Sequence, residues 1–153
     1  MLQVGMPFPQ FSLADQNGKT LALSDFKGKW LVVYTYPKDD TPGCTLEGRG
    51  FSALKEQYDS LGATVLGLSA DDVKSHRDFC DKFGLKISLL ADPDARLLTA
   101  MQVGQSDWKG TLYWNRVSFI VDTHGVIRKI YPKVNPEGHE KEVLNDLRVL
   151  QLI

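Results

Sequence analysis

Runs of apolar residues alternate along this chain with segments of helical spacing. The segment 30–36, Trp-Leu-Val-Val-Tyr-Thr-Tyr, is almost continuously apolar, β-branched and aromatic, which is typical of a central strand covered on both faces. Ala63–Ser69 is a second run of this kind. The apolar residues between the two follow roughly helical spacing, and Gly62 can end the helix: Leu46, Phe51, Leu54, Tyr58 and Leu61. This part of the chain therefore predicts a strand, a helix and a strand.

The same alternation continues to the end of the chain. Asp71 or Asp72 can cap a helix that ends at Gly84, with Val73, His76, Cys80 and Phe83 on one face. Next come a short strand, a short helix, two strands around the turn Asp122-Thr123-His124-Gly125, and a closing helix, expected at 87–91, 93–101, 117–121, 126–131 and 138–150. Asn17-Gly18 lies between the apolar segments 11–13 and 20–23 and predicts an N-terminal β-hairpin. The fold class is α/β, with a mixed sheet between helical layers.

The composition narrows the class of protein. The chain has 153 residues, of which 42% are apolar, so we expect one domain over residues 1–153. Its 18 Lys and Arg against 19 Asp and Glu give a formal charge of −1. This balance provides no basic field for nucleic acid or an anionic membrane, and we expect neither partner. The beginning of the sequence lacks the pattern of a signal peptide, which favours a cytoplasmic protein.

Cys44 is the first candidate for chemistry. It follows Pro42-Gly43 and begins the first predicted helix, where backbone N–H groups favour negative charge. A thiol in such a position ionises more readily than a free one, and the thiolate is the reactive form. Position alone leaves two interpretations open, a nucleophile and a buried cysteine at the start of a helix.

The residues before Cys44 favour the nucleophile. The segment 36–45, Tyr-Pro-Lys-Asp-Asp-Thr-Pro-Gly-Cys-Thr, contains the pattern Pro-x-x-x-Thr-x-x-Cys. It resembles the active-site motif of the peroxiredoxins, which are thiol-dependent peroxidases, and the full string resembles their Q-type branch, the bacterioferritin comigratory protein group. The resemblance extends over almost the whole chain. It implies a thioredoxin-like fold, a peroxide substrate, no cofactor or metal, and a monomer.

The resemblance also implies a role for each matching residue. The Cys44 thiolate attacks the peroxide and becomes a sulfenic acid. The Thr41 hydroxyl hydrogen-bonds the sulfur and the bound peroxide, and Pro37 shields the sulfur from water. Arg116, just before the strand at 117–121, matches the arginine with which the family stabilises the thiolate and polarises the peroxide.

Cys80 is the only other thiol in the sequence. Many Q-type relatives carry a resolving cysteine five residues after the first, but this chain has Arg49 there. Another subset of the family carries it on the helix where Cys80 is expected, which implies an intramolecular Cys44–Cys80 disulfide. Forming it requires the helix that begins at Cys44 to open, and Gly48 and Gly50 weaken that helix. The alternative is that Cys80 is a core thiol.

The remaining polar and aromatic candidates are expected to be structural. His76 and Cys80 are four residues apart on a helix, but two further metal ligands at a useful spacing are missing. His124 and His139 are expected at the surface, and Asp39 and Asp40 in a solvated turn. Three aromatic residues are expected to pack in the core or in a loop: Trp108, Tyr113 and Trp114. The three aromatic residues could also line the peroxide entrance or a partner surface.

Two functions are compatible with these residues. The first is a peroxidase that reduces hydrogen peroxide and organic hydroperoxides through Cys44 and Cys80 and is recycled by thioredoxin or a similar dithiol protein. The second is a redox sensor or chaperone that uses oxidation of Cys44 as a switch. The sequence contains no separate partner-binding module, which favours the enzyme.

Overall fold

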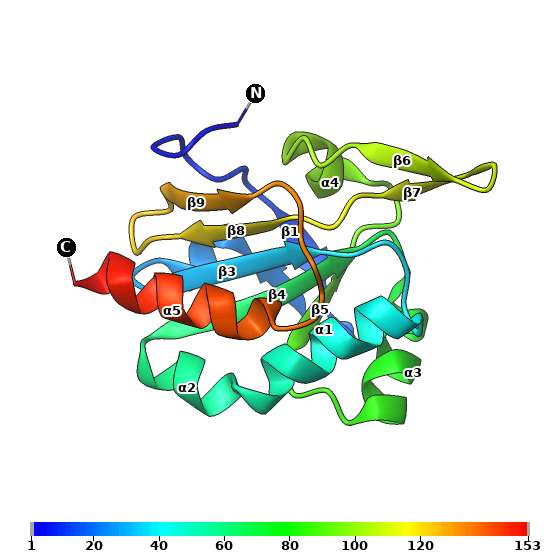
Figure 1. The fold of residues 1–153 in the computed structure, drawn as a ribbon, viewed down its shortest axis with the longest axis horizontal. Helices are drawn as coiled ribbons and strands as arrows, with labels where there is room; N and C mark the ends of the chain where they lie inside the picture. Colours follow the sequence, from blue (N-terminus) through cyan, green and yellow to red (C-terminus); the bar gives the residue numbers. More distant parts are fainter. Residues whose placement is uncertain (1, 153) are drawn as a thin grey trace.

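A mixed five-stranded sheet forms the centre of the molecule (Figure 1), seen here in a computed structural model that describes residues 2–152. Its strand order is β5-β4-β3-β8-β9. The strands are β3 (Trp30–Thr35), β4 (Ala63–Ser69), β5 (Ser88–Ala91), β8 (Ser118–Val121) and β9 (Ile127–Tyr131). The three strands β3, β4 and β5 run parallel, whereas β8 pairs antiparallel with both β3 and β9. The mixed sheet predicted from the sequence is confirmed.

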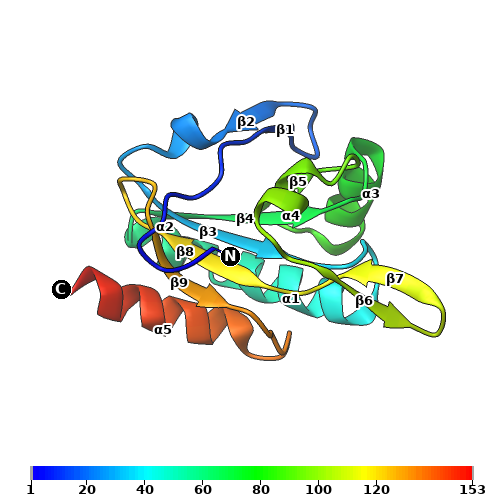
Figure 2. The same ribbon diagram turned by 90° about the horizontal axis from the view of Figure 1, so that it is seen from above.

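Helices and a hairpin cover the two faces of this sheet (Figure 2). One face packs against α1 (Pro42–Ala53), α2 (Lys55–Ser60), α3 (Val73–Phe83) and α5 (His139–Gln151). The other face packs against α4 (Arg96–Ala100), the short 3-10 helix η1 (Leu23–Phe26) and the N-terminal hairpin of β1 (Ser12–Ala14) and β2 (Thr20–Ala22). None of the helices within residues 2–152 is long and apolar enough to cross a membrane.

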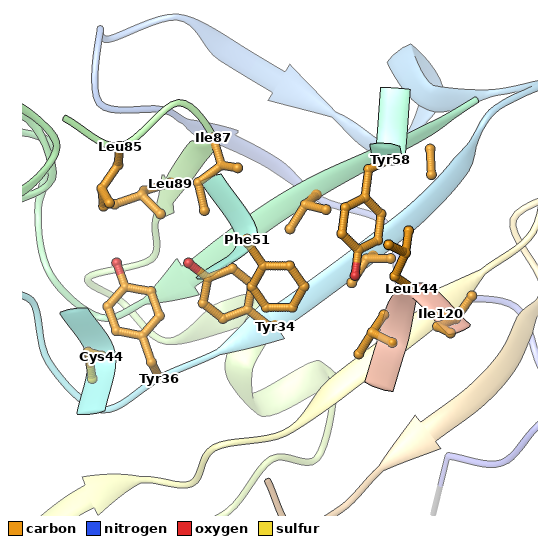
Figure 3. Close-up of a cluster of buried hydrophobic side chains, with 14 of the residues drawn as sticks. Tyr34, Tyr36, Cys44, Phe51, Tyr58, Leu85, Ile87, Leu89, Ile120 and Leu144 are labelled. Atoms are coloured by element: carbon orange, nitrogen blue, oxygen red, sulfur yellow. The ribbon is translucent and has the colours of Figure 1, made fainter. Parts of the chain in front are cut away.

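Strand β3 separates two apolar cores. Val32, Tyr34 and Tyr36 belong to the core under α1 and α5, while Leu31 and Val33 belong to the core under α4. This alternation explains why segment 30–36 is apolar at nearly every position, since side chains of a strand point to opposite faces in turn. Figure 3 shows the first core, with Cys44 near Tyr36 at one end and Tyr58 near Leu144 at the other.

Two differences between the structure and the predicted elements stand out. The single helix expected from Leu46 to Leu61 is divided at Leu54, whose backbone (φ −99°, ψ 10°) is not helical. A single non-helical residue hardly alters the spacing of apolar residues, so the sequence pattern does not reveal the break at Leu54. The second difference is a hairpin of β6 (Gln105–Trp108) and β7 (Thr111–Trp114), which extends from the body of the molecule (Figure 1). Its turn residues Lys109 and Gly110 both have positive φ, as a two-residue turn of type I′ requires.

Candidate active site

The loop after β3 leads directly into the first turn of α1. Thr41 is the residue before the helix, with extended backbone angles, and Pro42 occupies the first helical position, where its fixed φ and missing N–H cost least. The first helical hydrogen bond runs from Thr45 N–H to the Thr41 carbonyl, at 2.8 Å. Cys44 therefore lies in the first turn, where backbone N–H groups have no acceptor within the helix. Its side chain is only 1% exposed.

Arg116 brings a positive charge to this sulfur. Its Nη2 donates to Cys44 Sγ at 3.5 Å, although the two residues are 72 positions apart in sequence. The pairing of β3 with β8 creates this proximity. Thr35, the last residue of β3, donates from its hydroxyl to the Asn115 carbonyl at 2.8 Å and accepts from Val117 N–H at 3.1 Å. The segment that carries Arg116 is thus fixed beside the end of β3, next to the start of α1.

Glu47 completes the group and was not predicted from the sequence. Its Oε1 accepts from Arg116 Nη1 at 2.7 Å, and its side chain is fully buried. Burial raises the pKa of Glu47 to about 7, although the adjacent Arg116 charge acts in the opposite direction. Its other oxygen, Oε2, has no hydrogen-bond partner among residues 2–152. The signal in the sequence is the spacing of three between Cys44 and Glu47, which places both on one face of a helix.

Gly43 lies close to Arg116 at the start of α1. A Cβ atom there would lie 3.1 Å from Arg116 Nη2 and 3.5 Å from Pro136 Cγ. The absence of a side chain at Gly43 therefore lets the guanidinium approach the sulfur.

Thr41 and Pro37 lie in the loop that precedes Cys44. The Thr41 hydroxyl donates to the Lys38 carbonyl at 2.8 Å. Since a hydroxyl has one donor and two acceptor lone pairs, Thr41 remains able to accept a hydrogen bond from a bound peroxide. Among the residues that the structure describes, the Thr41 hydroxyl makes no hydrogen bond to Cys44. Pro37 is half-buried in the same loop.

Cys80 lies in different surroundings, near the end of α3. It is 7% exposed, is a free thiol like Cys44, and belongs to the same apolar core. Burial raises the pKa of the Cys80 thiol to about 12, and the negative charges of Asp39, Asp81 and Asp15 act in the same direction. Cys80 is therefore a neutral, unreactive thiol in this conformation.

The glycines of α1 allow close packing. A Cβ atom on Gly48 would lie 3.2 Å from Leu85 Cδ1, and one on Gly50 would lie 2.6 Å from Glu140 Cδ. Both positions therefore have a packing role besides the low helix propensity noted in the sequence. Alanine at either position would disturb contacts as well as stiffen the helix, so this pair is a poor test of helix opening.

Two side chains expected at the surface are buried. Asp39 is not a solvated turn residue, because its carboxylate bonds Tyr36, Ser75 and His76 on the inside of the loop. His139 is also buried, with Nε2 at 2.8 Å from Ser118 Oγ and Nδ1 at 3.0 Å from Glu142 Oε1. Burial lowers the pKa of His139.

Other surface expectations hold in part. Asp40 and His124 are exposed, as expected. Trp114 packs against the core under α4, but Trp108 is 62% exposed on β6, so packing was the wrong interpretation for it. Its ring makes an edge contact with Tyr113, with centroids 6.4 Å apart.

Comparisons of sequence and fold show which known proteins this chain resembles. A family model described as AhpC/TSA family matches residues 4–130. A Coxiella burnetii protein named as a peroxiredoxin, bcp, is 40% identical over an alignment 153 positions long, which covers 95% of this chain and 99% of that one. A crystal structure of a cysteine-to-serine mutant of Xylella fastidiosa PrxQ covers 99% of this chain and 98% of its own, with a TM-score of 0.94 and 35% identity.

Structures from Xanthomonas campestris add detail about chemistry. One, of bacterioferritin comigratory protein, concerns that protein's alkyl peroxide reduction activity. It has a TM-score of 0.86 and 37% identity, and the match covers 91% of this chain and 90% of that one. Two structures of peroxiredoxin Q each replace one cysteine by serine, and the two cysteines are 36 positions apart, as Cys44 and Cys80 are here.

Proposed function

Because this chain belongs to the AhpC/TSA family and is a thiol peroxidase of the peroxiredoxin Q type with a thioredoxin-like fold, we propose that Cys44 is its peroxidatic residue and that it reduces alkyl hydroperoxides and hydrogen peroxide. One observation carries the assignment of Cys44. The sulfur lies in the first turn of α1 and accepts a hydrogen bond from the Arg116 guanidinium. Both features favour a negative sulfur, which is the form that attacks a peroxide.

The first step uses the residues around Cys44. The thiolate attacks the terminal peroxide oxygen, so a sulfur–oxygen bond forms while the oxygen–oxygen bond breaks. Cys44 becomes a sulfenic acid, and the alkoxide leaves and takes a proton to give an alcohol, or water from hydrogen peroxide. Arg116 stabilises the charge on the sulfur and on the leaving oxygen. Thr41 accepts from the peroxide hydroxyl, and Pro37 limits the access of water.

The second step joins the two thiols. The Cys80 thiolate attacks the sulfur of the Cys44 sulfenic acid, a disulfide forms, and the hydroxyl group leaves as water after it takes a proton. The equal spacing of the two replaced cysteines in the Xanthomonas campestris protein supports this pairing. A disulfide needs Cα atoms about 4.4–6.8 Å apart, and both free thiols are buried on separate helices. We infer that the step includes local opening of at least one helix, which brings the two sulfurs together.

Regeneration needs an external dithiol. We assign this role to thioredoxin or a similar protein, which would reduce the Cys44–Cys80 disulfide by thiol–disulfide exchange and become a disulfide itself. We further propose that residues 1–153 act as one domain, as a monomer, in the cytoplasm.

Mass mapping of the peroxide-treated protein tests this proposal. One equivalent of cumene hydroperoxide should convert the reduced protein to a form that has lost two hydrogens, with a tryptic peptide pair linked through Cys44 and Cys80. Cys80→Ser should instead yield a Cys44 sulfenic acid that dimedone traps. Disulfides found only between Cys44 residues of two chains, or a Cys80 thiol that stays free throughout turnover, would rule out the second step.

A further inference from the structure

Asp39 and His76 form a buried contact that the peroxidase chemistry does not use. His76 Nδ1 lies 2.7 Å from Asp39 Oδ2, and the two side chains are 0% and 4% exposed. His76 Nε2 lies 2.8 Å from the Leu90 carbonyl. Asp39 also accepts from the Tyr36 hydroxyl at 2.6 Å and from the Ser75 hydroxyl at 2.8 Å. Breaking these contacts costs free energy, because it leaves several buried donors without the carboxylate that accepts from them.

These atoms do not form a metal site. Ligand atoms of Asp39, Asp71 and His76 lie within 4.8 Å of one another. However, both ring nitrogens of His76 face oxygen atoms of the protein. Asp71 Oδ2 likewise accepts from Asp39 N–H at 2.9 Å and from the Ser69 hydroxyl at 2.6 Å. The cluster is internally satisfied, which is how a structural network behaves.

The network joins the two segments that carry the thiols. Asp39 lies in the loop between β3 and α1, five residues before Cys44, whereas Ser75 and His76 lie in the first turn of α3. His76 and Cys80 are four residues apart on α3, and both are buried. The same loop and helix also contact each other at the surface. Lys82 Nζ lies 2.8 Å from Asp40 Oδ2, with side chains 61% and 47% exposed.

We propose that Asp39 and His76 are positioning residues that hold the loop before Cys44 against α3, and that this contact sets how often the two thiol-bearing segments separate and open to form the disulfide. The inference rests on the proposed function, because it concerns the second step. In the closed form the network keeps Cys80 buried and Cys44 beside Arg116. Opening breaks the network, exposes Cys80 to water and makes its thiolate available to attack the Cys44 sulfenic acid, with water as the leaving product.

The surface contact provides a matched control. Exposed ion pairs contribute little to stability, whereas hydrogen bonds to a buried charged group contribute considerably more. Breaking Asp40–Lys82 therefore tests whether any link between loop and helix matters. Breaking Asp39–His76 tests the buried network, and His76→Gln is the decisive variant, because Asp39→Asn also removes a negative charge that raises the pKa of Cys80. A second control, Leu98→Ala, creates a cavity in the core on the opposite face of the sheet and lowers global stability without touching either thiol segment.

The experiment measures opening in two independent ways. In the reduced protein, without peroxide, the rate at which a maleimide modifies Cys80 is followed by mass spectrometry. When reduced protein is mixed with peroxide, stopped flow separates the oxidation of Cys44 from the disulfide formation that follows it. In Asp39→Asn and in His76→Gln, we expect Cys80 labelling and disulfide formation each to rise about tenfold, as loss of a buried hydrogen bond to a charged group predicts. In these two variants, the rate of Cys44 oxidation should change less than about threefold. The control Lys82→Ala should change neither Cys80 labelling nor disulfide formation more than about twofold. The control Leu98→Ala should lower the urea midpoint and leave both rates unchanged.

The outcomes separate this inference from the proposed function. If wild type forms no Cys44–Cys80 disulfide, the second step of the proposed function fails, while Cys80 labelling in reduced protein still tests the network. Unchanged or slower labelling and disulfide formation in both variants would overturn the inference. So would equal acceleration in Leu98→Ala, because the effect would then be one of global stability. If Asp39→Asn and His76→Gln do not fold, Ser75→Ala removes one donor at the edge of the network and should accelerate both rates about threefold; no acceleration there overturns the inference as well.

Discussion

The two cysteines are buried in the same apolar core, yet their surroundings have opposite charge. Cys44 lies at the start of a helix with a guanidinium on its sulfur. Cys80 lies within a helix, and the charges that affect it are the carboxylates of Asp39, Asp81 and Asp15. A buried thiol without a cation stays protonated, whereas a cation and a helix N-terminus favour the thiolate. Burial alone therefore does not decide which thiol reacts.

This difference also gives the two steps an order. On the proposed function, Cys44 beside Arg116 reacts with peroxide first, and Cys80 takes part only after the helices have opened. The asymmetry depends on a few named contacts, and each can be removed.

Removing the Cys44 sulfur should have the largest effect. Cys44→Ser keeps the side-chain volume close to that of cysteine but has no thiolate, so peroxide consumption should fall to background while the protein still folds. A peroxide assay with thermal denaturation as the folding check measures this. Cys80→Ser is the matched control and should retain one fast equivalent of peroxide reduction but lose turnover with a dithiol protein. A serine variant at position 44 that still consumed peroxide at the wild-type rate would contradict the comparison.

Removing the positive charge should come next. Arg116→Met should slow oxidation of Cys44 by about a hundredfold or more, as loss of a donor to a developing charge does in comparable sites. It should also destabilise the protein, because Glu47 loses its partner in the interior. The double variant Arg116→Met with Glu47→Gln should recover stability but not reactivity. Stopped-flow kinetics and urea unfolding measure the two effects. Recovery of reactivity in the double variant would mean that Arg116 acts through packing.

Thr41 should have a smaller effect because its hydroxyl is bonded to Lys38 and not to the sulfur in this structure. Thr41→Val removes the hydroxyl that can accept from the peroxide, and we expect oxidation of Cys44 to slow by between about ten- and a hundredfold. Thr41→Ser keeps the hydroxyl and its bond to Lys38, and it should restore most of the rate. Equal rates in the valine and serine variants would show that the hydroxyl is not used.

Glu47→Gln should affect peroxide reduction least, because glutamine can still accept from Arg116. Its effect should appear in how the free energy of unfolding changes with pH. Burial raises the pKa of Glu47 from 4.5 to about 7, so the folded form keeps a proton that the unfolded chain releases. This contribution to stability is complete below about pH 4.5 and is lost as the pH rises to about 7.

Urea unfolding at pH 5 and pH 8 measures this contribution. The loss of stability between the two should be roughly 3 kcal/mol greater in wild type than in Glu47→Gln, at 1.36 kcal/mol per pKa unit. Parallel curves for the two proteins would mean that Glu47 is ionised throughout.

The sequence predicted the parts of the fold that depend on local patterns. β4 and α3 have the expected boundaries, with Asp72 accepting from Ser75 N–H at one end of α3 and a left-handed Gly84 at the other. Strand β3 and the N-terminal hairpin also appear where apolar runs and Asn17-Gly18 predicted them. Arg116 was identified through the family resemblance. No local pattern links it to Cys44, because 72 positions separate the two residues in sequence.

The missed features depend on partners distant in sequence. Asp39 resembles a turn carboxylate until α3 packs against the loop and supplies Ser75 and His76. Glu47 resembles an exposed helix residue until β8 brings Arg116 to it. His139 is buried because Ser118 of β8 lies beside the start of α5. In each case the polar side chain is buried because a segment distant in sequence supplies its hydrogen-bond partners. The local sequence pattern does not show which distant segment will pack there.

The separation of Arg116 from Cys44 also has a consequence for biosynthesis. A ribosome translates the cysteine well before the arginine, and the two meet only after β8 has paired with β3. Until then the emerging chain carries an ordinary cysteine without a cationic neighbour, which is a poor scavenger of peroxide. On the proposed role of Cys44, its reactivity toward peroxide is therefore acquired late, when β8 pairs with β3.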